Sequence, residues 1–258
     1  MVPGLTDLQL DAKAPSTVWG HAIAVIEACP VSHPLVNFAL EGAKRRFARL
    51  VQPKEPLSVS TLQEIAARFA SSTSLSDLRF LFIPLVGLAG FFRIAEITNI
   101  ALRDVSILSD HMSVYVPQRK NDQYREGHTA FLARTGKVTC PVAVTEQLIK
   151  LLPQSSSAFP LVRRIVKARS KEYFHSSLGV SVSTLREEFK RHIKPFVSDV
   201  SRYGTHSLKS GAASNPACWK IAGDLLDIHA GWRCESTKHR YIKHGLSERL
   251  AVSKDLSI

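Results

Sequence analysis

The segment Thr205-His206-Ser207-Leu208-Lys209-Ser210-Gly211 lies in the last quarter of the chain, with Trp232 and Tyr241 downstream. Trp232 follows His206 by 26 residues, and Tyr241 follows Trp232 by nine. A histidine and a lysine at the start of a helix favour phosphate binding there, and a tyrosine hydroxyl is a nucleophile once a base removes its proton. The spacing therefore predicts a phosphodiester site with a tyrosine nucleophile.

Two motifs upstream supply further candidates for this site. Arg93 lies in Gly90-Phe91-Phe92-Arg93-Ile94-Ala95-Glu96, and Lys120 lies in the polar run Arg119-Lys120-Asn121-Asp122-Gln123. A guanidinium holds two phosphate oxygens at once because its donors form a planar fork. A lysine placed among other cations can act as a general acid toward a leaving oxygen. The alternatives are a structural Arg93–Glu96 ion pair and a merely solvated turn lysine.

The charge of the chain favours a polyanionic partner. Of its 258 residues, 45% are hydrophobic and 22% are charged, and the formal net charge is +12. Residues 161–258 hold 18 of the 34 Lys and Arg but only 9 of the 22 Asp and Glu. This uneven excess favours a nucleic acid, against the alternative of a basic surface kept for solubility.

Several classes of protein are not expected. The sequence has no run of 18 uncharged apolar residues, so we expect no membrane span, and its N-terminus lacks the pattern of a secretory signal. The four cysteines show no Cys-x-x-Cys spacing. We therefore expect no metal site and no disulfide framework, and a reducing compartment is favoured. No cofactor is expected either.

The pattern of apolar residues predicts an α+β fold that is mainly helical. The proline-containing linker at 51–56 is the best domain boundary, between a helical region over 1–52 and a larger domain over 53–258. Alternating residues in the larger domain predict a small three-stranded antiparallel sheet. Strands are expected at 105–108, 112–116 and 129–132, and helices at about 58–71, 75–88, 141–152, 181–197, 205–217, 219–228 and 235–248.

The chain resembles the catalytic domain of the tyrosine recombinase (phage integrase) family over residues 56–258. The resemblance rests on the turn Arg119-Lys120-Asn121-Asp122-Gln123-Tyr124-Arg125-Glu126-Gly127 and on the run Gly204-Thr205-His206-Ser207-Leu208-Lys209-Ser210-Gly211-Ala212-Ala213. It looks closest to recombinases of eukaryotic mobile elements such as Cryptons and DIRS-type retroelements. That implies a nuclear protein if the source is eukaryotic, and otherwise a cytoplasmic one. Residues 17–50 look like a remnant of the family's helical, SAM-like core-binding domain, which implies a shortened copy or a fragment.

The resemblance implies a site-specific recombinase or integrase that cleaves and rejoins double-stranded DNA through a 3′-phosphotyrosine intermediate. Tyr241 would be the nucleophile, Lys120 the general acid, and His206 a phosphate contact that helps to remove the tyrosine proton. Phosphate oxygens would also be bound by Arg93, Lys209 and Trp232.

Other residues would support this reaction. Glu96 would orient its neighbours, and His229 is the runner-up for the position of Trp232. The tail over residues 245–258 would dock on a neighbouring copy and form a dimer or tetramer on DNA. Contacts to DNA are expected from the basic residues Lys44, Arg45, Arg46, Arg119, Arg125 and Arg240.

Lys209 departs from the family pattern, which usually has a second arginine at this position. Lysine keeps the charge but lacks the fork, so one directional hydrogen bond to phosphate is lost. Removing such a donor altogether costs on the order of 3 kcal/mol in the transition state, and we expect lysine to cost less. If only this clamp is defective, Lys209→Arg is expected to raise the cleavage rate.

Three interpretations therefore stay open. The first is a slow but competent recombinase, and the second is a weakened or inactive domesticated copy that only binds DNA. The third is a basic helical scaffold unrelated to DNA, which would be favoured if affinity for duplex DNA did not fall steeply with salt.

Overall fold

The computed structural model describes residues 54–119, 126–168 and 171–232, together with a few single residues on either side of these ranges: Phe38, Glu41, Gly42, Arg45, Lys238, Tyr241 and Ile242. The chain divides into two compact units, Met1–Gln52 and Pro53–Ile258. Most of the first unit lies outside the described residues. Its identity as a core-binding region stays a prediction.

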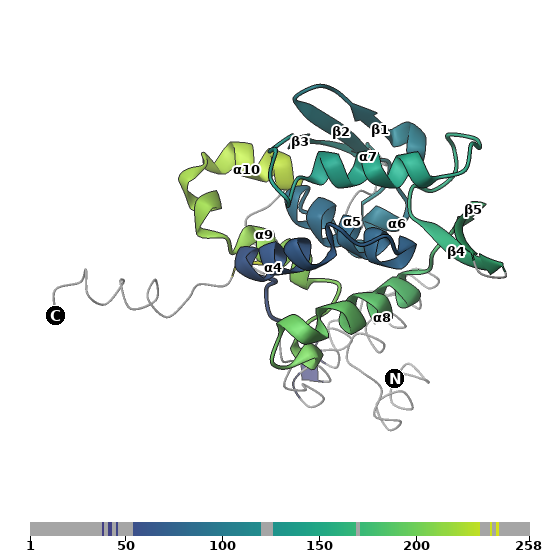
Figure 1. Ribbon diagram of the computed structural model, residues 1–258. Coiled ribbons are helices and arrows are strands. Elements are labelled where there is room, and N and C mark those ends of the chain that lie inside the picture. The colour runs from purple at the N-terminus through teal and green to yellow at the C-terminus, as the bar shows by residue number, and fades with distance from the viewer. Residues whose placement is uncertain are drawn as a thin grey trace, which may run out of the picture. The chain divides into compact units, whose positions relative to one another are not determined.

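The second unit is α+β, as predicted, with helices in the majority (Figure 1). Its helices are α4 (Val59–Phe69), α5 (Leu75–Ala89), α6 (Ile94–Thr98), α7 (Pro141–Leu151), α8 (Val182–Ile193), α9 (Ser207–Ala213) and α10 (Gly223–Ala230). Its strands are β1 (Val105–Ile107), β2 (His111–Val116), β3 (His128–Ala133), β4 (Arg163–Ala168) and β5 (Lys171–Gly179). Short 3-10 turns lie at Leu102–Asp104, Lys194–Phe196, Val200–Arg202 and Pro216–Lys220.

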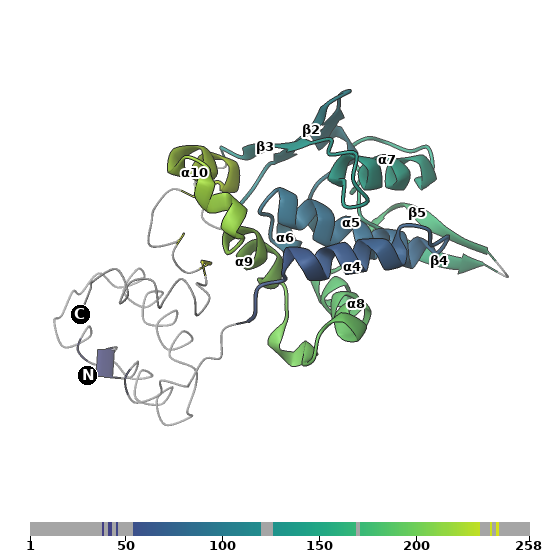
Figure 2. The ribbon, with the colours of Figure 1, turned by 60° about the vertical axis from the view of Figure 1, so that its left-hand side comes forward.

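Helix α5 is the centre of this unit. It begins after Ser74, whose hydroxyl accepts a hydrogen bond from the backbone N–H of Asp77 at 3.3 Å. All residues from Leu78 to Gly87 are buried, as expected for a helix that is apolar on every side. Helix α5 contacts α4, α7, α8 and α9, and in Figures 1 and 2 it lies between α7 on one side and α4 and α8 on the other.

The three-stranded sheet is antiparallel with the order β1-β2-β3, and the three predicted strands are confirmed within one residue at each end. Val114 pairs with Val105 on one side and with Ala130 on the other. Met112, Val114 and Val116 are buried, whereas the residues between them are not, so one face of the sheet packs on the core. The turn from β2 to β3 leaves the described residues after Arg119 and returns at Glu126.

A second antiparallel hairpin, β4–β5, corrects the prediction of helices alone after residue 140. Only Arg163 in β4 and Phe174 in β5 are buried. The hairpin therefore lacks the regular apolar alternation by which a strand is recognised in a sequence. It lies at the opposite end of this unit from α9 and α10 (Figures 1 and 2).

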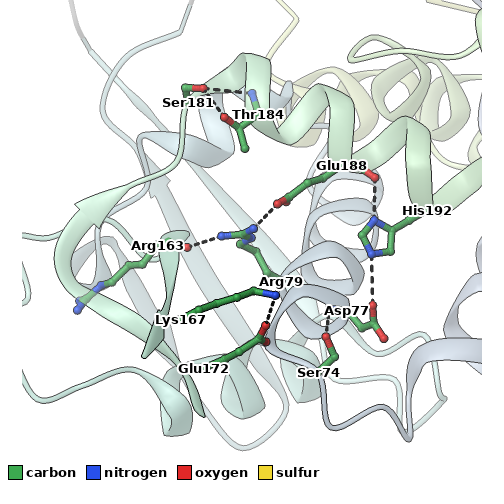
Figure 3. A network of polar contacts seen from close by, with 10 residues as sticks. All are labelled: Ser74, Asp77, Arg79, Arg163, Lys167, Glu172, Ser181, Thr184, Glu188 and His192. Carbon is green, nitrogen blue, oxygen red and sulfur yellow. Dashed lines mark hydrogen bonds and ion pairs between the residues drawn. The ribbon is translucent and has the colours of Figure 1, made fainter. Parts of the chain in front are cut away.

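A buried polar network ties α5 to α8 and β4 (Figure 3). The guanidinium of Arg79 donates to the Arg163 carbonyl oxygen at 2.8 Å and forms an ion pair with Glu188. The ring of His192 stacks on Phe80 with centroids 4.4 Å apart, and its Nδ1 lies 2.8 Å from the Glu188 carbonyl oxygen. The Arg79 guanidinium and the His192 ring therefore each have an oxygen partner, from another part of the fold or from the preceding helical turn.

The last two described helices are shorter or shifted relative to the prediction. Helix α9 ends at Ala213 because Pro216 follows, and the residue before a proline disfavours helix. Helix α10 ends at Gly231, whose φ of 61° lies in the left-handed region that favours glycine. The helix predicted at 235–248 lies almost wholly outside the described residues. Among those described, every helix is too short or too polar to cross a bilayer.

Candidate active site

Helix α9 is held deep in the fold by a close backbone contact. The N–H of Leu57 donates to the Ser207 carbonyl oxygen at 2.9 Å. A Cβ added at Gly211 would lie 2.2 Å from the Leu57 carbonyl oxygen, so the helix can approach this closely only with glycine there. Every residue of α9 is buried, which carries Lys209 into the interior.

Lys209 is almost completely buried, with 1% of its surface exposed. Its Nζ donates a hydrogen bond to the carbonyl oxygen of Ala230, the last residue of α10, at 3.1 Å. The same nitrogen lies 5.5 Å from the ring centroid of Trp232 and 5.4 Å from that of Tyr241. The predicted lysine, tryptophan and tyrosine are therefore brought together.

Arg93 connects the start of α6 to Tyr241. Its Nη1 donates to Glu96 Oε1 at 2.7 Å, and its backbone N–H donates to Glu96 Oε2 at 2.8 Å. Its Nη2 donates to the hydroxyl oxygen of Tyr241 at 3.0 Å. The ion pair with Glu96 and the contact with the candidate nucleophile thus coexist, because they use different nitrogens of one guanidinium.

Tyr241 lies between two other residues singled out by the sequence. Its ring stacks near that of Trp232, with centroids 6.3 Å apart and an interplanar angle of 26°. The exposed ring of His206, at the N-cap of α9, has its centroid 6.5 Å from that of Tyr241. Four of the other five predicted catalytic residues, Arg93, His206, Lys209 and Trp232, therefore lie around the Tyr241 side chain.

Trp232 contributes a buried donor. Only 8% of the residue is exposed, and its indole Nε1 has no hydrogen-bond partner among the residues that the structure describes. An unpaired buried N–H is costly, so this donor is available to a hydrogen-bond acceptor that enters the site. The ring rests on Phe91, with centroids 5.5 Å apart and planes at 88°.

Phe91 is a supporting residue that sequence reasoning missed. Its φ of 53° is unusual for a bulky residue, and such conformations persist only where the surrounding packing holds them. It lies two residues before Arg93 and directly after Gly90. No pattern in the sequence marks this backbone conformation.

His229 makes a hydrogen bond to the end of α5. Its Nε2 lies 2.7 Å from the carbonyl oxygen of Ala89 near the end of α5, so this nitrogen carries the proton and donates. Its ring meets that of Phe91 edge-on at 5.6 Å. The geometry therefore puts Trp232, and not the runner-up His229, beside Tyr241.

Arg119, expected to contact the DNA backbone, is a buried residue below the site, with 8% of its surface exposed. Its Nη1 donates to the Ala230 carbonyl oxygen at 2.9 Å, and its Nε lies 3.6 Å from Glu96 Oε1. A Cβ at Gly231 would lie 1.6 Å from Arg119 Nη1, so glycine there makes room for the guanidinium.

Burial and neighbouring cations lower the pKa values of two groups in the site. Burial, with the charges of Arg119 and Arg93, lowers the pKa of Lys209 to about 7. Burial, with the charge of Arg119, lowers the pKa of His128 to about 4, so that this ring is neutral at physiological pH. Its Nε2 lies 3.1 Å from the His229 carbonyl oxygen.

Several predicted residues lie outside the described part of the chain. The general acid candidate is one of them, and so are most of the basic residues expected to contact DNA: Lys120, Lys44, Arg46, Arg125 and Arg240. Arg45 in the first unit is described and exposed. Among the described residues, no three or more His, Cys, Asp and Glu gather in a way that could hold a metal ion.

Comparisons with known proteins bear on this arrangement. No family model matches the chain. An "Integrase/recombinase xerD homolog" from Selenomonas ruminantium is 25% identical over 255 residues, which cover 93% of this chain and 72% of that protein. The fold is similar to that of the Tn1549 transposon integrase, solved in complex with circular intermediate DNA, with a TM-score of 0.62, 10% identity and coverage of 97% of this chain and 82% of the other.

The fold is also similar to the XerH site-specific recombinase bound to its difH substrate, with a TM-score of 0.52 and 12% identity. That match covers 74% of this chain and spans half the length of the XerH chain. The structural likenesses show a tyrosine recombinase fold. The sequence relative carries the name of an integrase/recombinase, in agreement with this fold.

Proposed function

We propose that the protein is a DNA strand transferase that cleaves and rejoins double-stranded DNA through Tyr241. The observation that carries this proposal is the hydrogen bond of 3.0 Å from Arg93 Nη2 to the Tyr241 hydroxyl. A phosphate oxygen bound by that guanidinium would lie next to the hydroxyl, and close placement of reacting groups is a large part of catalysis. DNA as substrate is supported by the DNA-bound structures of proteins with a similar fold.

The proposed reaction exchanges one phosphate ester for another. The Tyr241 oxygen attacks phosphorus, the bond from phosphorus to the 5′ oxygen breaks, and a 3′-phosphotyrosyl ester forms. His206 assists removal of the tyrosine proton, and Lys120 gives a proton to the leaving 5′ oxygen. Because the ester keeps the bond energy, attack by a 5′ hydroxyl rejoins the strand without ATP.

Three donors would bind the oxygens of the scissile phosphate. Arg93 and Lys209 carry charge, and Trp232 offers an indole N–H that is buried and unpaired among the described residues. Donors fixed in advance stabilise developing charge without reorganising during the reaction. The ion pair with Glu96 would hold the Arg93 guanidinium in place.

Covalent trapping tests the proposal. The chain is incubated with a pool of nicked duplexes that have randomised cores. Cleavage next to the nick releases a short fragment, so the covalent adduct can no longer be reversed by rejoining. We expect a DNA adduct that survives denaturing electrophoresis and is absent from Tyr241→Phe. Tyr173→Phe, on the exposed hairpin strand β5, is the matched control and should keep the adduct. Salt-dependent duplex binding without any adduct would favour the copy that only binds DNA.

The role proposed for Lys120 has its own test. A duplex in which sulfur replaces the bridging 5′ oxygen has a leaving group that needs no protonation, because thiols are far more acidic than alcohols. Lys120→Ala should be slow on the oxygen substrate and close to wild type on the sulfur substrate. Equal defects on both substrates would contradict the role of general acid.

We also propose that copies assemble on DNA through the C-terminal tail. Helix α10 exposes Leu225 (58%) and Ile228 (68%) one turn apart, an apolar pair available to a partner. The tail over residues 245–258 carries apolar residues that suit such a surface. Deletion of this tail should reduce the mass of the complex on DNA in analytical ultracentrifugation, and an unchanged mass would contradict the idea.

The origin of the chain is a further proposal. The turn around Lys120 supports a eukaryotic mobile element as the source, and the basic run Lys44–Arg46 is compatible with nuclear import. Residues 1–52 would be a partial core-binding region. A fluorescent fusion excluded from nuclei would contradict the nuclear location. Unchanged DNA affinity after removal of residues 1–52 would contradict the core-binding role.

A further inference from the structure

Two cations from distant parts of the chain donate to one carbonyl oxygen. Arg119 Nη1 and Lys209 Nζ donate to the Ala230 oxygen at 2.9 and 3.1 Å. This oxygen belongs to the last turn of α10, where carbonyls have no partner within the helix and the helix dipole is negative. Arg119 thus places a buried guanidinium close to Lys209, the position at which the family usually has its second arginine.

Arg119 also reaches the other side of the site. Its Nε lies 3.6 Å from Glu96 Oε1, the same oxygen that accepts from Arg93 Nη1. One buried side chain therefore links the carboxylate that holds Arg93 to the carbonyl that holds Lys209. Because Ala230 is followed by Gly231 and Trp232, the same contact fixes the turn that carries the indole donor.

We propose that Arg119 is a positioning residue for Lys209 and Trp232, and that Arg119 and Lys209 together replace the single guanidinium expected at position 209. This inference rests on the proposed function of the site. Arg119 places a second cation at the Ala230 oxygen and fixes that oxygen through its planar guanidinium, and Lys209 supplies the donor that comes from α9. A guanidinium at position 209 would be bulkier than the Lys209 ammonium and would have to fit beside Arg119 at the Ala230 oxygen, which the two side chains already share.

The surroundings of Lys209 agree with a shared role. Among the described residues, the charged and titratable groups that interact with it include Arg93, Glu96, Arg119, His128 and Tyr241. Glu96 is the only carboxylate in this set, so a lysine that stood alone against these cations would easily lose its proton. The Arg119 guanidinium beside it adds a second cation at the same carbonyl oxygen.

A double-mutant cycle tests this pairing by the rate of adduct formation in a single turnover. Lys209→Arg alone should be no faster than wild type. This differs from the expectation from the sequence, in which the same substitution raises the cleavage rate. Arg119→Gln should be slower by at least about tenfold, because a misplaced donor costs this much or more. In the Arg119→Gln background, Lys209→Arg should recover about tenfold or more. An equal effect of Lys209→Arg in both backgrounds would overturn the pairing.

A second measurement needs no catalysis. In protein with ¹³Cε-labelled lysine, the resonance that disappears in Lys209→Arg reports the titration of Lys209. Its midpoint should move to higher pH in Arg119→Gln and stay near the wild-type value in Arg119→Lys, which keeps the charge. An unmoved midpoint in Arg119→Gln would overturn the inference. If Arg119→Gln does not fold, Arg119→Lys should still slow adduct formation, because lysine lacks the fork, and wild-type rates would overturn the inference.

The two readouts separate this inference from the proposed function. A shifted midpoint in a protein that forms no adduct would leave the pairing in place and contradict the strand transferase. A DNA adduct together with additive effects of the two substitutions would support the strand transferase and contradict the pairing of Arg119 with Lys209.

Discussion

Among the described residues of the second unit, the buried polar groups around Arg79 and those around Tyr241 differ in how their charge is balanced. Around Arg79, the carboxylate of Glu188 and the carbonyl oxygen of Arg163 are direct partners (Figure 3). Around Tyr241, the cations Arg93, Arg119 and Lys209 share the carboxylate of Glu96. A balanced cluster stabilises the fold, whereas a surplus of buried positive charge favours an anionic ligand.

The largest contrast is expected between the two arginines that anchor these clusters. Arg79→Gln should lower the free energy of unfolding by about 3–5 kcal/mol, because it leaves the Glu188 carboxylate buried without its partner. Arg93→Gln should instead lower the rate of adduct formation by about 10²–10³, because a donor to the phosphate is removed.

Urea denaturation and single-turnover cleavage of both variants measure this contrast. Glu96 keeps Arg119 as a partner when Arg93 is changed, so we expect a smaller loss of stability there than at Arg79. The comparison fails if Arg93→Gln unfolds as easily as Arg79→Gln while each folded molecule cleaves at the wild-type rate.

A smaller effect follows from the titration of Lys209. Because its pKa is lowered to about 7, the side chain is charged below that pH and increasingly neutral above it. Phosphate binding needs the charged form, so kcat/KM for adduct formation should fall by up to about tenfold per pH unit above 7. A pH series of wild type and Lys209→Arg measures this fall in kcat/KM, which should disappear in the variant because arginine stays protonated. If the fall persists unchanged in Lys209→Arg, it is caused by the titration of another group.

The smallest effect is expected at the unpaired indole. Trp232→Phe keeps an aromatic ring against Phe91 but removes the N–H, so cleavage should slow by about tenfold with little change in stability. Thermal unfolding and adduct kinetics separate the two contributions. A stability loss without any kinetic effect would mean that Trp232 acts only in packing.

Much of the fold follows from local patterns. The apolar run of α5 and the alternation in β2 and β3 predict these elements almost to the residue. The hairpin β4–β5 is different, because its strands pair with each other and bury only Arg163 and Phe174. Its existence depends on pairing between strands rather than on a periodic apolar face.

The candidate site likewise combines residues that the sequence predicts with a contact that only the fold creates. Arg93, His206, Trp232 and Tyr241 stand at spacings that a sequence reveals, and the fold brings them together. The burial of Arg119 depends on Ala230, which is 111 residues away, and on the space left by Gly231. A contact of this kind is set by tertiary packing, so the sequence alone predicted only a basic residue near DNA.

The most direct test of Tyr241 as the nucleophile is to locate the covalent bond. The DNA adduct is digested with protease and nuclease, and the modified peptide is sequenced by mass spectrometry. We predict a nucleotide joined through its 3′ phosphate to Tyr241, together with a released strand that carries a free 5′ hydroxyl. A bond to any other residue, or a 5′-linked nucleotide, would contradict the account.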